Sequence, residues 1–300
     1  MRSSLDQLSV FIAVVDAGGF AAAARRLNRQ QSAISYAISA LEEQMGGIAL
    51  FDRTTRRVTL TPTGEAVLAD ARRINADLDA LRARVKGLQT GLEAELGLVI
   101  DVMAPAEVLV SVLADFRERF PTVRIRLTME VLGGVPALVL NRACHIGVSG
   151  PLFYQTDGLE REQIGATTLL PVEAPTHALA VLEGEISSAE ARRHDQVVLT
   201  DRSQLSQGRD FAVIGDQTLA VSDLATKYYL VRSAIGWGNL PEAMVREDLR
   251  EGRLVHVPLL EWRARPYPLY AIYRSDAPPG PAGRWFVDRM ARAYLDHSRG

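Results

Sequence analysis

The chain has 300 residues, 47% of them hydrophobic, so it is long enough to bury two or three separate cores. No apolar run approaches the ~18 residues that a membrane-spanning helix needs, and the N-terminal segment MRSSLDQLSV lacks the long apolar stretch of a signal peptide. Composition therefore predicts a cytoplasmic protein with no membrane partner. The single cysteine, Cys144, excludes an internal disulfide and any paired-cysteine metal or redox motif.

Charge is unevenly distributed along the chain. Residues 1–90 carry 12 Lys and Arg against 9 Asp and Glu, a net charge of +3, whereas the remainder carries 22 against 27, a net charge of −5. This asymmetry is compatible with a phosphate-facing N-terminal domain attached to an unrelated one, but it does not demonstrate one. The motifs have to decide.

The first ninety residues begin with two helices. Apolar residues recur every three or four positions from Ser4 to Ala17, and Gly18-Gly19 ends this first helix. A short second helix, FAAAARRLN, ends at Asn28, and RQQ turns the chain into a third helix, QSAISYAISALEE. Two short helices joined by a tight turn, the second with a polar outer face, indicate a helix-turn-helix that places its second helix in the major groove.

The polar face of the third helix consists of neutral side chains that both donate and accept hydrogen bonds, which suits them to base edges. Arginines on either side suit phosphates. The candidate DNA-binding residues are Arg29, Gln30, Gln31, Ser32, Ser35, Tyr36, Ser39, Arg53, Arg56 and Arg57. Taken alone, this helix is equally compatible with a surface helix whose polar side is merely solvated, because short amphipathic helices are common.

The next segment, IALFDRTTRRVTLTPTGE, predicts two short strands around an arginine-containing turn, a hairpin typical of a wing beside a recognition helix. Thr61 and Pro62 then predict the N-cap and first position of a long helix. Apolar residues follow at alternating spacings of four and three: Val67, Ala71, Ile74, Leu78, Leu81, Val85 and Leu88. This heptad seam predicts a helix ~43 Å long that pairs with a second copy of the chain.

These motifs together resemble the N-terminal domain of LysR-type transcriptional regulators. The positions that carry the resemblance are Phe20, Ala23, Ala24, Gln31, Ala33, Ile34, Ser35, Leu41, Glu42, Gly47, Leu50, Phe51, Arg53, Leu60, Thr61 and Gly64. The family often has Pro where this chain has Ser32 and a long polar or basic residue where it has Tyr36, which bears on the bases read. The resemblance implies antiparallel pairing of the long helices, and a homodimer or homotetramer.

After residue 91, strands alternate with helices. A buried strand LGLVIDVM, a helix over 105–119, the strand VRIRLTME, the helix VPALVLNRA and the strand HIGVSG form a βαβαβ run, which predicts a parallel sheet. Further strands are expected near 166–174 and 196–201, at RLVHVPL and at YPLYAIYR. Helices are expected near 223–235, over 241–251 and at the C-terminus. Two α/β lobes with the chain crossing between them predict a cleft.

This second part resembles the effector-binding domain of the same family, which is similar to periplasmic solute-binding proteins. The expected fold is therefore α/β, with a winged helix-turn-helix over 1–61, a long linker helix over 62–90 and a two-lobed effector domain over 91–300. The first lobe is expected at about 91–161 and 267–300, and the second at about 162–266. The expected function is sequence-specific, effector-dependent transcriptional regulation of a double-stranded DNA operator.

The resemblance implies effector-binding residues where the two lobes face each other: Ala104, Pro105, Ala106, Ser149, Gly150, Thr200, Asp201, Arg202, Ser203, Gly236 and Trp237. Family members commonly place Ser or Thr at the end of the first strand, where this chain has Met103 to Ala106. Pro105 begins a helix whose free amides attract anions, and Arg202 offers a bidentate partner for a carboxylate, so a small organic anion is the expected effector. Alternatively, Asp201 and Glu107 satisfy these groups without any ligand.

Catalysis finds no support in the motifs. The five histidines lack metal-ligand spacing, and HExxH, Walker A and G-x-S-x-G motifs are absent from the sequence. GWGNLP lacks the third glycine of a dinucleotide fingerprint and follows a helix. We therefore expect no catalytic residue, no metal and no cofactor. The alternative function is a solute-binding protein or enzyme on the same α/β fold with a helical oligomerisation arm, which the complete helix-turn-helix and wing disfavour.

Overall fold

The computed structural model describes residues 5–52, 58–89, 91–151, 157–182, 184–200, 203, 205, 213–260 and 265–297. These residues form two compact units, Met1–Lys86 and Gly87–Gly300, each with its own hydrophobic core. In the described part of the chain, no single helix has the length and apolar character of a membrane span. The first two helices, bent by 120° at their junction, meet that criterion together by length and composition only.

The N-terminal unit follows the predicted order of three short helices, a hairpin and a long helix. The strands pair antiparallel with Phe51 opposite Leu60, and they are shorter than the sequence predicts. The elements are α1 (Leu5–Asp16), α2 (Phe20–Leu27), α3 (Gln31–Gln44), β1 (Phe51–Asp52), β2 (Thr59–Leu60) and α4 (Pro62–Gln89). Asn28 ends α2 in the left-handed conformation, with a φ of 52°, which lets the chain turn directly into α3.

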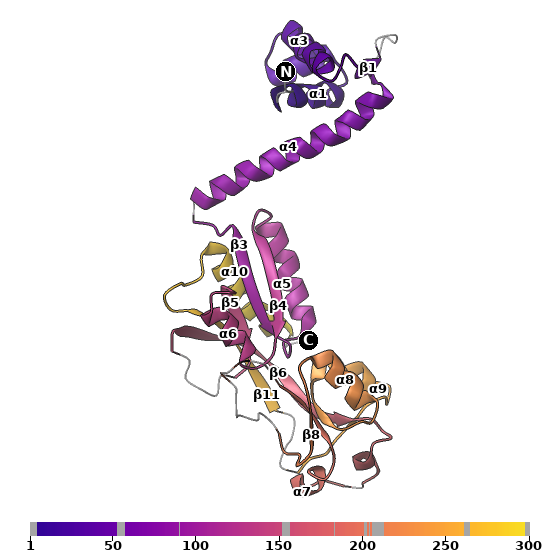
Figure 1. Cartoon of the computed structure of the whole chain (residues 1–300), viewed down its shortest axis with the longest axis vertical. Coiled ribbons are helices and arrows are strands. Elements are labelled where there is room, and N and C mark those ends of the chain that lie inside the picture. The colour runs from indigo at the N-terminus through magenta and orange to yellow at the C-terminus, as the bar shows by residue number, and fades with distance from the viewer. Residues whose placement is uncertain are drawn as a thin grey trace. The chain divides into compact units, whose positions relative to one another are not determined.

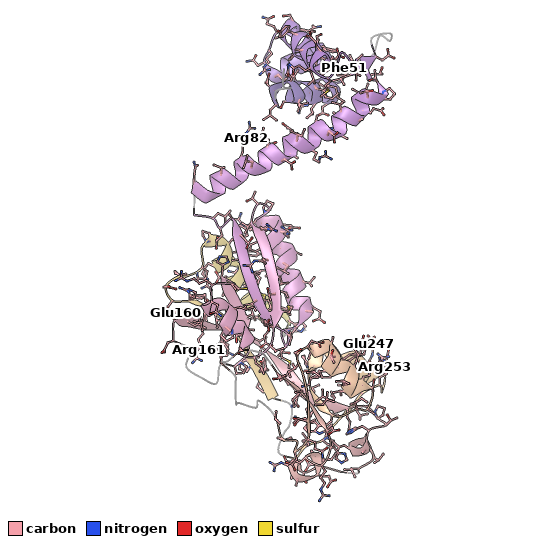
Figure 2. All side chains as sticks on the ribbon, in the orientation of Figure 1. Phe51, Arg82, Glu160, Arg161, Glu247 and Arg253 are labelled. Carbon is pink, nitrogen blue, oxygen red and sulfur yellow. The ribbon has the colours of Figure 1, made fainter. Side chains whose placement is uncertain are left out.

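The core of this unit forms where α1, α2 and α3 meet the hairpin. Phe51, labelled in Figure 2, packs edge-on against both Phe11 and Phe20, with ring centroids 5.4 and 5.3 Å apart. Ile34 and Ile38 of α3 are fully buried in the same cluster. The hairpin thus anchors the inner face of α3, and burial of these side chains supplies most of the free energy that holds the helix in place.

The start of α4 is tied to the end of the hairpin. Thr61 caps the helix as predicted, because its Oγ1 accepts the N–H of Gly64 at 3.0 Å and also donates to the carbonyl of Ala49 at 2.8 Å. A Cβ added at Gly64 would lie 2.1 Å from the carbonyl oxygen of Leu50. Glycine is therefore required at this position by the close approach of two backbone segments.

The apolar stripe of α4 does not act as one continuous seam. Val67 and Ala71, the first two positions of the predicted heptads, pack into the core of the same unit, and Ala71 is 1% exposed. Further along, Ile74, Leu81 and Val85 are 40%, 53% and 49% exposed. The prediction of an unbroken intermolecular seam is therefore wrong at its N-terminal end, because the first two turns of the stripe are already covered by the chain's own helices.

The C-terminal unit begins with the predicted βαβαβ run. The first strand of this run lies between the other two in the sheet and pairs parallel with both. The buried face of the first helix carries the residues that periodicity indicated, such as Val112 and Phe116. The elements are β3 (Glu95–Asp101), α5 (Ala106–Arg119), β4 (Arg124–Glu130), α6 (Gly134–Leu140) and β5 (Ile146–Ser149). We call this part, together with the last helix α10 (Pro281–His297), lobe I.

Two long strands run from lobe I into the second half of the unit, as Figure 1 shows. They are β6 (Leu159–Glu173) and β11 (Arg265–Arg274), and they pair antiparallel with each other. The sheet has the order β10-β6-β11-β5-β3-β4, with β9 also paired to β6. One sheet is thus continuous through both lobes, and the sequence predicted only the second half of β6.

Lobe II surrounds the far end of β6. A separate parallel pair, β7 (Gln196–Leu199) and β8 (Thr218–Val221), packs with α8 (Leu224–Arg232). The remaining elements are η1 (Ala178–Val181), α7 (Ser188–Ala191), β9 (Gly238–Pro241), α9 (Glu242–Arg250) and β10 (Val255–His256). The sequence did not predict β8 or β9. The β9 sequence, GNLP, has the Gly, Asn and Pro that are typical of a turn. In the fold it instead pairs antiparallel with the edge of β6, because tertiary context overrides local preference in strands.

Candidate functional site

The outer face of α3 is made of exposed polar side chains on a helix whose inner face is fully buried. Gln31, Ser32, Ser35 and Ser39 are exposed, as is Gln30 at the N-cap. The opposite side holds the buried Ile34, Ile38 and Leu41. Because the inner face of α3 is packed into the core, the side chains of its outer face all point away from the core. The first amides of a helix also lack intrahelical partners and attract anions such as phosphate.

Tyr36 is the one large aromatic side chain within this polar face. It is 78% exposed, and it lies between the serines at positions 35 and 39 on the helix. A tyrosine combines an apolar ring with a hydroxyl that donates and accepts, and such amphipathic side chains are favoured where one partner surface replaces water. The face therefore presents both hydrogen-bonding groups and an apolar contact.

Arg29 is not a free cation. Its guanidinium forms a bidentate ion pair with Asp6 of α1, with Nη1–Oδ2 and Nη2–Oδ1 distances of 2.9 and 2.8 Å. The hydrogen bond from Arg29 lowers the pKa of Asp6 below its usual value. This pair ties the turn between α2 and α3 to α1. The role of Arg29 in DNA binding stays a prediction, with its guanidinium paired to an exposed carboxylate in this structure.

The chain is held in place where it enters the hairpin. A buried carboxylate, that of Glu42 near the end of α3, accepts the N–H of Leu50 at 2.8 Å, which fixes the chain entering the hairpin. The predicted residues Arg53, Arg56 and Arg57 lie outside the described residues, between β1 and β2.

In the C-terminal unit, two predicted effector segments, the end of the first strand and Ser149–Gly150, meet Tyr267 around one buried carboxylate. Asp101, the last residue of β3, is 1% exposed. Its Oδ1 accepts the N–H of Met103 at 2.9 Å, and its Oδ2 accepts the N–H of Gly150 at 3.2 Å and the hydroxyl of Tyr267 at 3.0 Å. The ends of β3 and β5 and the first half of β11 are thereby joined at the point where the sheet leaves lobe I.

Burial dominates the electrostatics of Asp101. Desolvation raises its pKa to about 6, although the bonds from Met103, Tyr267 and Gly150 act in the opposite direction. Gly150 is needed at this junction, because a Cβ there would lie 1.8 Å from the hydroxyl oxygen of Tyr267. Tyr294 of α10, buried with a hydroxyl that has no hydrogen-bond partner among the described residues, has a raised pKa through burial and the nearby Asp101.

The other predicted residues of lobe I lie around this carboxylate. Ser149 is 2% exposed at the end of β5. Ala104 and Pro105 are buried after β3, and Ala106 begins α5 and is exposed. Sequence reasoning missed both Asp101 and Tyr267, although a single acid inside the apolar run LGLVIDVM was a signal available in the sequence. The amides of Met103 and Gly150 are already occupied by this internal anion.

In lobe II the predicted residues separate into two groups. Thr200 follows β7, and its N–H donates to the carbonyl of Val221 at the end of β8. Ser203 is half-buried, while Asp201 and Arg202 lie outside the described residues. Gly236 and Trp237 lie at the opposite end of β7, where the N–H of Trp237 donates to the carbonyl of Asp195. The structure therefore does not bring Gly236 and Trp237 together with Thr200.

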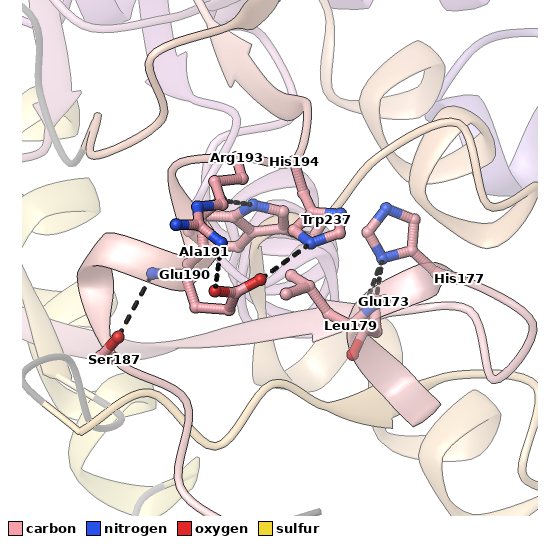
Figure 3. Close-up of polar contacts among 9 residues, drawn as sticks. All are labelled: Glu173, His177, Leu179, Ser187, Glu190, Ala191, Arg193, His194 and Trp237. Carbon is pink, nitrogen blue, oxygen red and sulfur yellow. Dashed lines mark hydrogen bonds and ion pairs between the residues drawn. The ribbon is translucent and has the colours of Figure 1, made fainter. Parts of the chain in front are cut away.

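Trp237 is a core residue of lobe II. Its ring is fully buried with Leu179, Ile186 and Leu259, and its Nε1 donates to the carbonyl of Ala191 at 3.3 Å (Figure 3). A Cβ at Gly236 would lie 2.4 Å from the carbonyl oxygen of Asp195. The expectation that these two residues contact an effector is corrected: Gly236 permits close backbone packing, and the indole fills the core with its only polar group satisfied.

Comparison with protein families identifies the chain. Residues 5–65 match the model described as "Bacterial regulatory helix-turn-helix protein, lysR family", and residues 89–294 match the model "LysR substrate binding domain". The chain belongs to the LysR family. The predicted fold and the predicted class of function, a DNA-binding transcriptional regulator with an effector-binding domain, are thereby confirmed.

Relatives of known name are transcriptional regulators of the same family. The HTH-type transcriptional activator AllS of Klebsiella pneumoniae is 29% identical over 256 residues, which cover 83% of this chain and 93% of that protein. The HTH-type transcriptional regulator YeeY of Escherichia coli is 29% identical over 259 residues, covering 85% of this chain and 83% of the relative.

Solved LysR-family structures share the fold. Corynebacterium glutamicum OxyR aligns with a TM-score of 0.55 at 22% identity, covering 99% of this chain and 94% of that one. LysG of the same organism, solved with its bound effector Arg, aligns with a TM-score of 0.51 at 19% identity and covers 98% of both chains. The helix-turn-helix, linker helix and two-lobed architecture is therefore that of full-length members of the LysR family.

In this LysR-family chain, the described residues contain no group of three or more His, Cys, Asp or Glu arranged to hold a metal ion.

Lobe II contains a buried carboxyl group in contact with a histidine. Oε2 of Glu173, at the end of β6, lies 2.5 Å from Nδ1 of His177, which precedes η1. Glu173 is fully buried and its Oε1 has no hydrogen-bond partner among the described residues.

Proposed function

We propose that this regulator reads its operator with the outer face of α3 and that a small molecule bound at the junction of lobes I and II controls it. The observation that supports the first part is the contrast between the two faces of α3. Beside a fully buried inner face, the outward side chains form a neutral hydrogen-bonding face: Gln31, Ser32, Ser35, Tyr36 and Ser39. Such side chains pair with base edges in the major groove.

Replacing Gln31 or Ser35 with alanine is expected to reduce the preference for the operator over unrelated duplex DNA by ~1 to 3 kcal/mol, because one base contact is lost. The operator would first be selected from a random duplex pool with the wild-type chain. Binding of selected and unrelated duplexes is then compared at fixed salt concentration.

Gln89→Ala, an exposed glutamine at the end of α4, is the matched control and should leave the preference unchanged. Equal preferences for wild type, Gln31→Ala and Ser35→Ala would show that the face is solvated surface and would refute the proposed reading helix. A wild-type chain that selects no sequence from the pool would refute specific DNA binding as a whole.

We further propose that the exposed half of the α4 stripe pairs with a second copy of the chain. In the described chain an apolar strip of α4 is exposed to solvent at Ile74, Leu81 and Val85, with the half-buried Leu78 between them. A helix of 28 residues is about 42 Å long, which leaves about two heptads for contact beyond the two turns used by the helix-turn-helix. Family resemblance favours antiparallel packing and association into dimers or tetramers.

The double variant Ile74→Glu/Leu78→Glu is expected to be monomeric at concentrations where wild type is dimeric or larger, because like charges would be buried at the seam. Size-exclusion chromatography with light scattering measures this. The control, Ala69→Glu/Ala76→Glu, adds the same charges on exposed positions of the other face of α4. A dimeric Ile74→Glu/Leu78→Glu variant with intact DNA affinity would contradict the seam.

For the effector we propose a small organic anion, recognised in the cytoplasm by groups at the junction of the lobes. The support is the N-terminus of α5 at Pro105–Ala106, where no side chain caps the helix amides, together with Thr200 in lobe II. Lobe closure on the ligand would bias the orientation of the paired DNA-binding units by no more than the ligand's differential affinity for the two states.

A further inference from the structure

Lobe II contains a buried lysine whose charge has no carboxylate partner among the described residues. Lys227 is 5% exposed, yet within the part of the chain that the structure describes its ammonium has no ion pair with any carboxylate. A buried ammonium without a partner is costly, because it loses its hydration and gains nothing in return. A buried lysine that lowers the stability of the fold in this way is expected where its ammonium binds an anion from outside the chain.

The choice of lysine at this position stands out against the rest of the sequence. Only two of the 34 basic side chains are lysines, Lys86 and Lys227, and all the others are arginines. Lysine presents a compact charge with three donors on a long apolar stem, and it tolerates burial by giving up its proton, which arginine does not. Burial accordingly lowers the pKa of Lys227 to about 7.

The surroundings of Lys227 place its stem against the backbone of lobe II. A Cβ added at Gly238 of β9 would lie 3.1 Å from Cε of Lys227, so the absence of a side chain at Gly238 leaves room for the stem. Val231, one turn further along α8, also packs close to Gly238 and is fully buried. The methylene groups of Lys227 are therefore part of the core, and only the ammonium needs a polar partner.

The direction of the ammonium follows from the helix. Lys227 lies in the first turn of α8, where its N–H donates to the carbonyl of Asp223. Side chains of a helix lean toward its N-terminus, which for Lys227 is the end of α8 that follows β8. At this end the N–H of Thr200 donates to the carbonyl of Val221, at 2.9 Å. We infer from this lean that the ammonium lies toward the edge of lobe II that carries Thr200.

The nearest acid on α8 does not neutralise Lys227. Oδ1 of Asp223 accepts the N–H of Thr226 at 2.7 Å as the N-cap of the helix, and hydrogen bonds from the side chain and then the backbone of Thr226 lower the pKa of Asp223. We propose that Lys227 is the cation that binds the carboxylate of the effector, an inference that rests on the effector-dependent regulation proposed above. It names the effector class as a small organic acid whose charged end enters lobe II beside Thr200.

Thermal unfolding of the full chain tests this assignment with four acids and their neutral counterparts. The probes are acetate, pyruvate, succinate and benzoate, each against its amide. At least one acid is expected to raise the unfolding temperature of wild type while its amide does not. Lys227→Met should abolish that response through a loss of affinity of about 30-fold or more, since truncating a buried charge partner leaves the ligand's carboxylate unpaired.

Lys227→Met also distinguishes a ligand-binding role from a structural one. Without probe, this variant should unfold at a higher temperature than wild type, because methionine fills the same space without an unpaired charge. If a carboxylate of the chain itself were the partner of Lys227, the variant would instead be less stable than wild type. That result would overturn the proposal, as would an equal response of both proteins to the acids, or no response of wild type to any of them.

Lysine signals give a direct second measurement. With isotope-labelled lysine the chain should show only two side-chain Cε signals, from Lys86 and Lys227. The stabilising acid is expected to shift the Lys227 signal and leave Lys86 in place, whereas the reverse pattern would overturn the assignment. Selected operator DNA should still bind ligand-free Lys227→Met with wild-type preference, so a failure of the α3 proposal remains distinguishable from a failure of this one.

Discussion

Replacing Asp101 with alanine is expected to destabilise the C-terminal unit by about 3 kcal/mol. The carboxylate accepts hydrogen bonds from the backbone of Met103 and Gly150 and from the hydroxyl of Tyr267, and all three donors lie in a buried region. Alanine leaves these donors without an acceptor, and each buried donor left unpaired costs ~1 to 3 kcal/mol. Relief from burying a charged carboxylate offsets part of this loss.

Urea unfolding of the full chain near pH 7 measures the effect, followed by signals from the tryptophans, all of which lie after residue 236. Tyr267→Phe removes one of the three donors together with its bond and should cost about 1 kcal/mol. Asp115→Ala, which deletes an acid of α5 paired with Arg289 and 43% exposed, is the control and should cost less than about 1 kcal/mol. If Asp101→Ala were no more destabilising than Asp115→Ala, the carboxylate would not be the joint that holds these strand ends.

Glu173→Gln is expected to change how stability depends on pH. Burial raises the pKa of Glu173 to about 8, so the folded chain keeps this proton from about pH 4.5 to 8 while the unfolded chain releases it. The unfolded state then binds fewer protons, and the free energy of unfolding falls as pH rises through this window. Glutamine does not titrate, so the variant should escape this decline.

The titration of His177, beside Glu173, restricts the pH range in which the effect of Glu173 on stability can be measured separately. Burial, with a smaller contribution from His194, lowers the pKa of His177, while Asp195 opposes this shift. A depressed histidine pKa makes stability rise with pH up to about 6.5, which opposes the Glu173 effect below that value. Between pH 6.5 and 8 both states leave His177 neutral, and wild type should lose ~2 kcal/mol relative to Glu173→Gln.

The contact geometry agrees with a protonated Glu173. Nδ1 of His177 lies 2.5 Å from Oε2 of Glu173 and 3.4 Å from the amide nitrogen of Leu179, which suits a neutral His177 that accepts a hydrogen bond from the proton-bearing Glu173 carboxyl (Figure 3). The side-chain amide introduced by Glu173→Gln keeps a donor for the same nitrogen, so the substitution leaves the contact in place.

Urea unfolding of wild type and variant at pH 6.5, 7.2 and 8.0 measures the difference. Glu190→Gln removes one carboxyl from an exposed ion pair with Arg193 in the same lobe and controls for net charge. Parallel pH profiles for wild type and Glu173→Gln would contradict a buried, protonated Glu173.

The helices of this chain and the faces that they bury could largely be predicted from the sequence. The inward residues of α5 and the boundaries of α3 follow from helical periodicity, and the cap of α4 follows from Thr61 and Pro62. The outward face of α3 also follows, because apolar residues at 34, 38 and 41 determine which side is buried. These features depend on side chains a few positions apart, whose geometry is set by the helix itself.

What only the tertiary structure decided is which partner covers each surface and which distant groups meet. Periodicity marks the α4 stripe as apolar, but the fold divides it between the unit's own core at Ala71 and solvent at Ile74. Likewise, Asp101 meets Tyr267 from 166 positions away, and Trp237 lies in a core, not at a ligand. Such contacts arise from strand pairing and burial across the whole unit, and the spacing of residues in sequence carries no information about them.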